Sequence, residues 1–82
     1  MLRYFTYILF SVSKGRYYIG HTENLIKRLD EHNSGNNKST KHGVPWIIVL
    51  QLEAKTRGDA MKLENEIKKR GAKRYLEDKG VL

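Results

Sequence analysis

The feature that most constrains the fold is a pair of β-favouring segments on either side of a short polar loop. Residues 4–10 are aromatic or aliphatic except for one threonine, and residues 16–20 resume this pattern after a loop that ends in Gly15. Aromatic and β-branched residues favour strands, and a short polar loop with glycine is typical of a β-hairpin. If the loop holds an even number of residues, Tyr7 and Tyr18 lie on the same face of the hairpin.

A helix is predicted after the hairpin. It begins at Thr22 as N-cap and ends just before Gly35. Its predicted apolar stripe consists of Leu25, Ile26 and Leu29. Residues 33–45 contain almost nothing that can be buried, so they predict a long loop, and loops of that length in compact domains are usually functional or mobile.

The second half of the chain predicts one more strand and two helices. Residues 46–52 form a continuous apolar run, which indicates a strand that is central or covered on both faces. Thr56 caps a second helix, Gly71 interrupts it, and residues 72–79 form a third. The apolar sector of the second helix contains Ala60, Met61, Leu63 and Ile67. The order β-β-α-β-α-α predicts an α+β fold, with a small three-stranded, mainly antiparallel sheet flanked by helices.

Size and charge narrow the classes of function. We expect the 82 residues to form one domain over residues 1–82. The absence of cysteine excludes disulfides and cysteine-ligated zinc. No apolar run is long enough to span a bilayer and no signal-peptide pattern is present, so we expect a cytoplasmic protein without a membrane partner. The net charge of +7 favours a polyanionic partner, most often nucleic acid.

Glu64 stands out because it falls between Ala60 and Met61 on the helical wheel, in the sector that faces the core. Burying a lone carboxylate is costly, so such a group is usually paired or bound to a cation. An ion pair with Lys68, one turn further on, and a metal site explain the position about equally well. A single carboxylate suits Mg²⁺ or Mn²⁺, which keep most of their waters, and does not suit zinc.

The two tyrosines and a pair of basic residues are the other candidate site residues. Tyrosines in strands usually serve packing, but the matching parity of Tyr7 and Tyr18 and the sequence Tyr-Ile-Gly at 18–20 favour a site. Glycine at the end of that sequence leaves open space where a substrate backbone could approach. Arg28 suits phosphate binding. His32, one turn later, suits acid–base chemistry or phosphate binding, or merely the C-terminal end of the helix dipole.

Two basic clusters, one in the loop and one near the C-terminus, predict a non-specific track for a phosphate backbone rather than base recognition. The alternative is an ordinary solvated surface. The predicted nucleic-acid-binding residues are Lys27, Lys38, Lys41, Lys68, Lys69, Arg70, Lys73 and Arg74. His21 and His42 are expected to be exposed and show no spacing typical of a metal site.

These residues together resemble the GIY-YIG nuclease superfamily, in particular its small single-domain, excinuclease C-like members of the UPF0213 type. The likeness runs from about Tyr4 to Lys69. Tyr7 stands where the first motif ends, although Phe5 and Thr6 replace its Gly-Ile, and residues 18–20 reproduce the second motif. The resemblance places the family's arginine at Arg28, a supporting contact at His32, the metal-binding glutamate at Glu64, and supporting positions at Gly20, Thr22 and Asn24.

The resemblance implies a metal-dependent endonuclease that hydrolyses DNA phosphodiester bonds with low sequence specificity, in a setting such as DNA repair. One Mg²⁺ or Mn²⁺ on Glu64 stabilises the leaving oxygen, a tyrosine activates water, and Arg28 neutralises charge on the phosphate. We expect Arg28, Lys27 and the metal to lower the pKa of that tyrosine. The expected substrate is DNA, including structured or branched DNA, rather than RNA.

One departure from the family pattern favours a different function. Larger members carry an asparagine after a basic–aromatic pair, where this chain has Leu76, so we expect the leucine to remove one polar group next to the substrate. The alternative is therefore a catalytically weak or inactive nucleic-acid-binding module of the same fold, and a third is a structural basic protein associated with RNA. We expect a monomer or weak homodimer, with a protein partner for targeting, because no separate DNA-binding domain is present.

Overall fold

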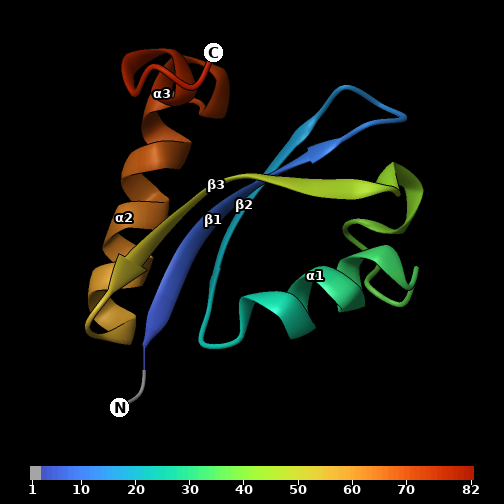
Figure 1. Cartoon of the computed structure of the whole chain (residues 1–82), viewed down its shortest axis with the longest axis horizontal. Helices are drawn as coiled ribbons and strands as arrows, with labels where there is room; N and C mark the ends of the chain where they lie inside the picture. Colours follow the sequence, from blue (N-terminus) through green and yellow to red (C-terminus); the bar gives the residue numbers. More distant parts are fainter. Residues whose placement is uncertain (1–2) are drawn as a thin grey trace.

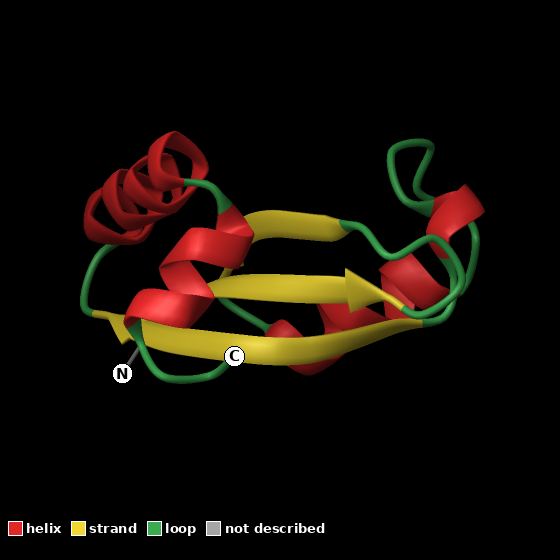
Figure 2. Ribbon diagram, turned by 90° about the horizontal axis from the view of Figure 1, so that it is seen from above, coloured by secondary structure: helices red, strands yellow, loops and turns green. Residues whose placement is uncertain are grey.

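The central strand of the sheet is the N-terminal one. A computed structural model, which describes residues 3–82, has the expected α+β order. Its elements are β1 (Tyr4–Ser11), β2 (Tyr17–Thr22), α1 (Leu25–Asn33), the short 3₁₀ helix η1 (Lys41–Gly43), β3 (Trp46–Ala54), α2 (Arg57–Arg70) and α3 (Ala72–Asp78). The strands lie side by side in the order β2-β1-β3, and both pairings are antiparallel (Figure 2).

Strand β1 supplies apolar side chains to both faces of the sheet because successive residues of a strand point to opposite sides. On one face Tyr7 and Leu9 pack with Leu25 of α1. On the other face Ile8 packs with Ile67 of α2 and Leu76 of α3. Figure 1 shows the corresponding arrangement, with α1 on one side of the strands and the pair α2 and α3 on the other.

Residues 46–52 were expected to form a strand that is central or covered on both faces, and the central placement is wrong, because β3 lies at an edge of the sheet. Its run of apolar residues has another cause. Ile8 pairs with Leu50 and Leu9 pairs with Ile48, so one residue of β3 bulges out of the register. The bulge turns the side chains on either side of it to opposite faces of the sheet. Ile48 therefore packs against the core on the α1 side, and Leu50 packs against the core on the α2 side.

The hairpin has the predicted register. The backbone N–H of Ser11 donates to the carbonyl of Arg16 at 2.8 Å, which leaves four residues in the loop. Tyr7 pairs with Gly20, and Leu9 with Tyr18. The even loop therefore puts Tyr7 and Tyr18 on the same face, as expected.

Helix α1 differs from the prediction at its start and on its apolar side. Asn24 is the N-cap, since its side chain accepts a hydrogen bond from the backbone N–H of Lys27 at 3.1 Å. The hydroxyl of Thr22 instead accepts from the backbone N–H of Asn24 at 3.2 Å, which closes the turn before the helix. Leu25 is buried, but Ile26 is 76% exposed and is not part of the core.

Helix α2 begins as predicted, with the side chain of Thr56 accepting from the backbone N–H of Asp59 at 3.0 Å. Ala60 and Ile67 are fully buried, whereas Met61, also predicted to face the core, is 46% exposed. Gly71 ends the helix with a φ of 92°, a conformation that glycine adopts at little cost. Among residues 3–82, no helix is both long and apolar enough to cross a membrane.

The long loop between α1 and β3 is more firmly anchored than its sequence predicts. It contains η1, and both Thr40 and Gly43 are buried. The indole N–H of Trp46 donates to the Thr40 carbonyl at 2.8 Å, and the Ser11 hydroxyl donates to the Gly43 carbonyl at 2.5 Å. These bonds fix one end of the loop against the β1–β2 hairpin.

Candidate active site

Four of the five predicted catalytic residues line one open pocket of about 290 Å³ at the β2 edge of the sheet. They are Tyr7, Tyr18, Arg28 and Glu64. The remaining lining residues are Ile19, Gly20, His21 and Arg57. Side chains from β1, β2, α1 and α2 thus meet at one place, although their catalytic roles stay predictions.

The pocket reaches around the β2 edge from one face of the sheet to the other. Tyr7 and Tyr18 point to the α1 face, and their ring centroids lie 6.4 Å apart. His21 pairs with Thr6, so both have the opposite parity and point to the α2 face, where Glu64 lies. Gly20, which also lines the pocket, lies opposite Tyr7 on the neighbouring strand and next to His21 in the chain.

Gly20 is required by a close contact with the tyrosines. A Cβ atom at this position would lie 2.6 Å from the Tyr7 hydroxyl oxygen and 3.2 Å from Cε1 of Tyr18. The open space that the sequence predicted on the side-chain side of Gly20 is therefore filled by the Tyr7 ring, whereas the approach of a substrate backbone at this position stays a prediction. The glycine lets the phenol lie flat on the strand.

Tyr7 is held from behind by two buried groups. Its hydroxyl oxygen lies 3.1 Å from Nε2 of His32, and Nδ1 of His32 lies 2.8 Å from the hydroxyl oxygen of Thr40. His32 is fully buried, Thr40 nearly so, and neither lines the pocket. His32, predicted as a catalytic residue, therefore contacts Tyr7 and does not line the pocket, and its catalytic role stays a prediction. Sequence reasoning missed Thr40, because a threonine in a polar loop gives no signal of burial.

Burial sets the protonation of this pair. Burial, reinforced by Tyr18, raises the pKa of Tyr7 well above its ordinary value, and Arg28 opposes this only in part. Arg28 lowers the pKa of Tyr7 as expected, but burial outweighs it, so the net shift of Tyr7 is upward. Burial, and then Arg28, lowers the pKa of His32 below its ordinary value, so the imidazole is neutral at pH 7. A neutral ring has one N–H donor and one acceptor, which matches two hydroxyl partners.

Glu64 is paired on both oxygens. Its side chain is 15% exposed, with Oε1 2.7 Å from Nδ1 of His21 and Oε2 2.6 Å from Nζ of Lys68. Burial favours the protonated form, but the hydrogen bonds from Lys68 and His21 outweigh it and hold the pKa of Glu64 below its ordinary value. The predicted ion pair with Lys68 is present. His21 was expected to be exposed, but its opposite parity to Gly20 was a signal that it faces α2.

Comparison with known proteins identifies the fold family. The model of the GIY-YIG catalytic domain matches residues 3–76. This chain belongs to the GIY-YIG family. It is 42% identical over 65 residues to the UPF0213 protein YsiG of Lactococcus lactis, and the match covers 78% of this chain and 62% of the relative. The chain therefore spans less than two thirds of that protein's length.

A solved structure supports the same family. The solution NMR structure of the UPF0213 protein BH0048 from Bacillus halodurans aligns with this GIY-YIG chain at a TM-score of 0.58 and 25% sequence identity. The alignment covers 98% of this chain and 85% of that protein. The fold and the resemblance predicted from the sequence are confirmed.

GIY-YIG nucleases generally use a divalent metal. The donor atoms at this site fit a metal ion that needs only one protein carboxylate. Within residues 3–82, no three His, Asp or Glu side chains are grouped as a metal cage. Glu64 is a single carboxylate at the pocket, which suits Mg²⁺ or Mn²⁺ completed by water and substrate phosphate. The Lys68 side chain is 53% exposed, so it can turn into solvent and free one carboxylate oxygen.

Arg57 is a pocket residue that sequence reasoning missed. It lies at the start of α2, with its guanidinium 5.0 Å from the centre of the Tyr4 ring and 3.9 Å from Glu23. It lines the active-site pocket and also an adjoining pocket of about 280 Å³. The adjoining pocket is lined by Thr22, Glu23, Asn24, Lys27, Arg28, Glu31 and Arg57. No motif marks Arg57, because its position depends on how α2 meets β2.

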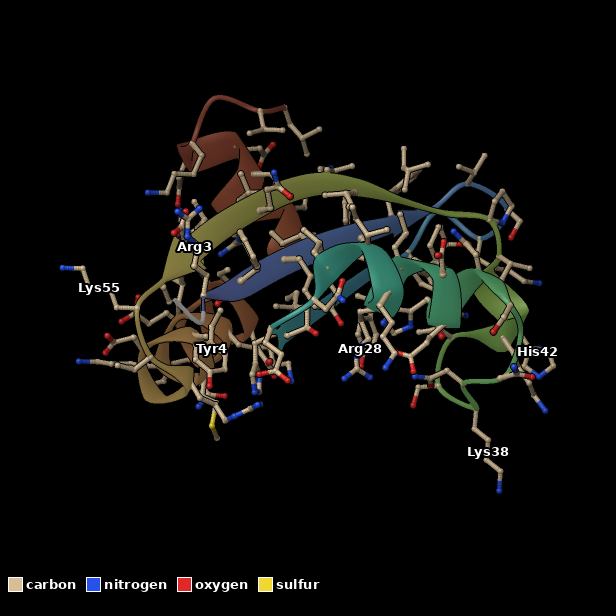
Figure 3. All side chains as sticks on the ribbon, turned by 60° about the horizontal axis from the view of Figure 1, so that its bottom comes forward. Arg3, Tyr4, Arg28, Lys38, His42 and Lys55 are labelled. Atoms are coloured by element: carbon tan, nitrogen blue, oxygen red, sulfur yellow. The ribbon has the colours of Figure 1, made fainter. Side chains whose placement is uncertain are left out.

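The predicted basic residues do not all gather at the site. Lys27 lines the adjoining pocket, and Lys68 reaches Glu64. Figure 3 shows Arg28 and Lys38 extending on the same side of the protein. The other predicted cations line neither pocket: Lys38, Lys41, Lys69, Arg70, Lys73 and Arg74. Arg70 forms an ion pair with Asp78, in which Nε of Arg70 lies 2.8 Å from Oδ2 of Asp78.

Leu76 is not a pocket residue. It is fully buried against Ile8 and Ile67, on the sheet face opposite to Tyr7. The expectation that leucine here removes a polar group next to the substrate is therefore wrong, since this position belongs to the core of the chain.

We predict that Gly20→Ala lowers the free energy of unfolding by about 1–3 kcal/mol, because the added methyl group overlaps the Tyr7 ring. Gly58→Ala is the matched control, since its Cβ would meet only the Thr56 hydroxyl at 3.9 Å. Urea denaturation of both variants measures the difference. Equal stabilities for the two variants would contradict the close contact.

We predict that stability falls as the pH drops below about 6.5, the ordinary pKa of histidine, because His32 stays neutral in the folded state while the unfolded chain takes up a proton. His32→Gln should make the free energy of unfolding nearly independent of pH between about pH 5 and 7. Glu64 does not interfere, because its lowered pKa confines its own effect on stability to more acidic pH. His42→Gln, at an exposed position, should keep it. Urea denaturation across this range measures the slope, and an unchanged slope in His32→Gln contradicts the assignment.

Proposed function

We propose that this GIY-YIG protein is a metal-dependent endonuclease that hydrolyses DNA phosphodiester bonds with low sequence specificity. Membership of the family makes it part of a nuclease superfamily. The observation that carries the proposal is the single pocket in which two phenols, two guanidinium groups and an ionised carboxylate meet. Hydrolysis of a phosphodiester needs stabilisation of added negative charge, a proton acceptor for water and a leaving-group stabiliser.

Arg28 is the proposed phosphate-binding residue. Its side chain is 41% exposed and is held only loosely by Glu31, at 3.7 Å. The guanidinium stays charged at all physiological pH values, and its planar fork matches two phosphate oxygens. Arg57, which lines the same pocket, supplies a second positive charge for the same phosphate.

Tyr7 is the proposed proton acceptor for the attacking water, acting together with His32. A neutral phenol can accept a proton only if it passes its own proton on. Nε2 of His32, 3.1 Å away, is free to accept it when Nδ1 carries the hydrogen and donates to Thr40. The proton then moves from water to the Tyr7 oxygen while the phenol proton moves to His32. Tyr18 completes the wall of the pocket on the same face.

Glu64 is the proposed holder of one Mg²⁺ or Mn²⁺. The bound ion would supply positive charge to the leaving oxygen of the scissile phosphate. Glu64 is already ionised at neutral pH because its pKa is lowered. His21 orients one carboxylate oxygen, and Lys68 neutralises the other until it is displaced.

The proposed partner is DNA, with RNA less favoured, and contact is made through the phosphate backbone. Cations on the exposed surface support this, in particular Lys27 beside the pocket and Lys38 in the loop. No element suited to reading base edges in a groove is evident in residues 3–82, which favours low sequence specificity. We further propose a cytoplasmic monomer or weak homodimer that is directed to its substrate by DNA structure or by a protein partner.

One observation favours a second candidate function, a nucleic-acid-binding module of the same fold that cleaves weakly or not at all. Both oxygens of Glu64 are satisfied by protein partners without a metal. In such a module Lys68 permanently takes the place of the ion, and DNA binding depends on salt without turnover under any divalent metal.

We predict that Glu64→Ala reduces nicking of supercoiled plasmid in Mn²⁺ by more than about 100-fold. The change removes the carboxylate that would hold the metal ion, whose positive charge stabilises the leaving oxygen. Glu66→Ala, exposed on the same helix and without an ion pair among the described residues, should retain activity. Nicking that survives Glu64→Ala comes from another site or a contaminant and contradicts the proposal.

We predict that Lys68→Ala lowers the Mn²⁺ concentration needed for half-maximal nicking, because one oxygen of Glu64 then loses its competing cation. Lys69→Ala is the control, since Lys69 is exposed and makes no ion pair within residues 3–82. A titration of Mn²⁺ against nicking rate measures the shift. An absence of cleavage in the wild type and in both variants, with DNA binding retained, would favour the binding module instead.

A further inference from the structure

A second and larger pocket lies beside the active site, between the β1–β2 loop and η1. Its volume is about 460 Å³, against about 290 Å³ for the active-site pocket. This volume falls within the range of pockets that enclose small ligands, about 300–1,000 Å³. Its lining residues are Lys14, Arg16, Tyr17, Tyr18, Ser39, His42, Gly43 and Trp46.

The second pocket and the active-site pocket share one side chain. Tyr18 lines both, so its ring forms the boundary between them. A ligand in the second pocket would therefore lie across the Tyr18 ring from the pocket that Arg28 lines. No other predicted catalytic residue takes part in the second pocket.

The charge of the second pocket is of one sign. Lys14 and Arg16 line it, and no carboxylate does, whereas Glu64 lines the active-site pocket. Both cations are exposed and make no ion pair within the described part of the chain. The pocket therefore favours an anionic ligand, and a phosphate group suits a lysine and an arginine together.

Aromatic rings line another part of the pocket. Tyr18 is partly exposed, and His42 is exposed on η1. The ring of Tyr17 points to the other face of the sheet, where it packs against the core of Ile8, Ile67 and Leu76. Trp46 is only 6% exposed and its indole N–H already donates to Thr40, so it offers a ligand apolar surface rather than a hydrogen bond. Flat rings beside unpaired cations are the features by which proteins bind single-stranded nucleic acid, with the bases stacked and the phosphates held electrostatically.

We propose that this pocket binds an unpaired nucleotide of DNA, with its base on the aromatic rings and its phosphate near Arg16 and Lys14. A base inside a continuous duplex is covered by its neighbours and reaches such a pocket only when it is unstacked. The preferred substrate is accordingly DNA with an unpaired nucleotide next to the scissile phosphate. This inference rests on the proposed function, because it places the base beside the site of hydrolysis.

The first test measures binding in EDTA, so that turnover plays no part. Fluorescence anisotropy compares an oligodeoxythymidine of about eight nucleotides with an abasic oligonucleotide of the same length and charge. We expect the base-bearing strand to bind about tenfold more tightly, as for one base stacked on an aromatic ring. Equal affinities in the wild-type protein overturn the proposal.

Three variants separate the stacking from the charge. His42→Ala should reduce the preference for the base-bearing strand, whereas Arg16→Ala should weaken both strands by the same factor. Lys55→Ala is the control, because Figure 3 shows Lys55 and His42 at opposite ends of the protein, and it should change neither affinity. A preference that His42→Ala leaves unchanged overturns the assignment of the base to this pocket. Tighter binding of an oligouridine RNA overturns the assignment to DNA.

The second test measures cleavage and separates this inference from the proposed function. With Mn²⁺, a duplex that contains a short unpaired stretch should be nicked about tenfold faster than the fully paired duplex. If no DNA is cut while the base preference persists, the hydrolytic function fails and the pocket stands. If paired DNA is cut as fast as unpaired DNA and the two oligonucleotides bind equally, hydrolysis stands and the pocket proposal is overturned.

Discussion

The contact between the phenol of Tyr7 and the bare backbone of Gly20 is the constraint on which the site depends. It joins the central strand to the edge strand at the one position where a side chain would push the ring away. With the ring in place, its hydroxyl reaches His32 behind it and the pocket in front of it. Glu64 on one face of the sheet and the tyrosines on the other line one pocket around the β2 edge.

The charges at this pocket are arranged by burial and by pairing. Tyr7, which lines the pocket, and His32 behind it are buried and neutral, whereas the groups at the rim are charged and partly exposed. Fixed neutral groups can pass a proton without large rearrangement of solvent, and mobile charged groups can follow a phosphate. Lys68 belongs to the mobile set, since about half of its side chain is in solvent although its ammonium group touches Glu64.

The sequence predicted most of the fold and four members of the pocket, for identifiable physical reasons. Alternation along β1 and β2 determines which face each tyrosine takes, and the inward position of Glu64 follows from helical spacing. The loop-buried Thr40 and the helix-start Arg57 were missed because tertiary packing alone gives them their positions. The placement of residues 46–52 at the centre of the sheet was wrong, because the bulge in β3 directs apolar side chains to both faces of what is an edge strand.

The anchored end of the long loop, residues 40–42, contributes to both pockets. Thr40 holds the imidazole behind the phenol, and His42, two residues further along the chain, lies at the mouth of the neighbouring pocket. The cost in chain entropy of ordering this short segment is therefore shared by both pockets. A nucleotide that stiffens the segment from outside also stiffens the support of the phenol, so occupancy and alignment are thermodynamically linked.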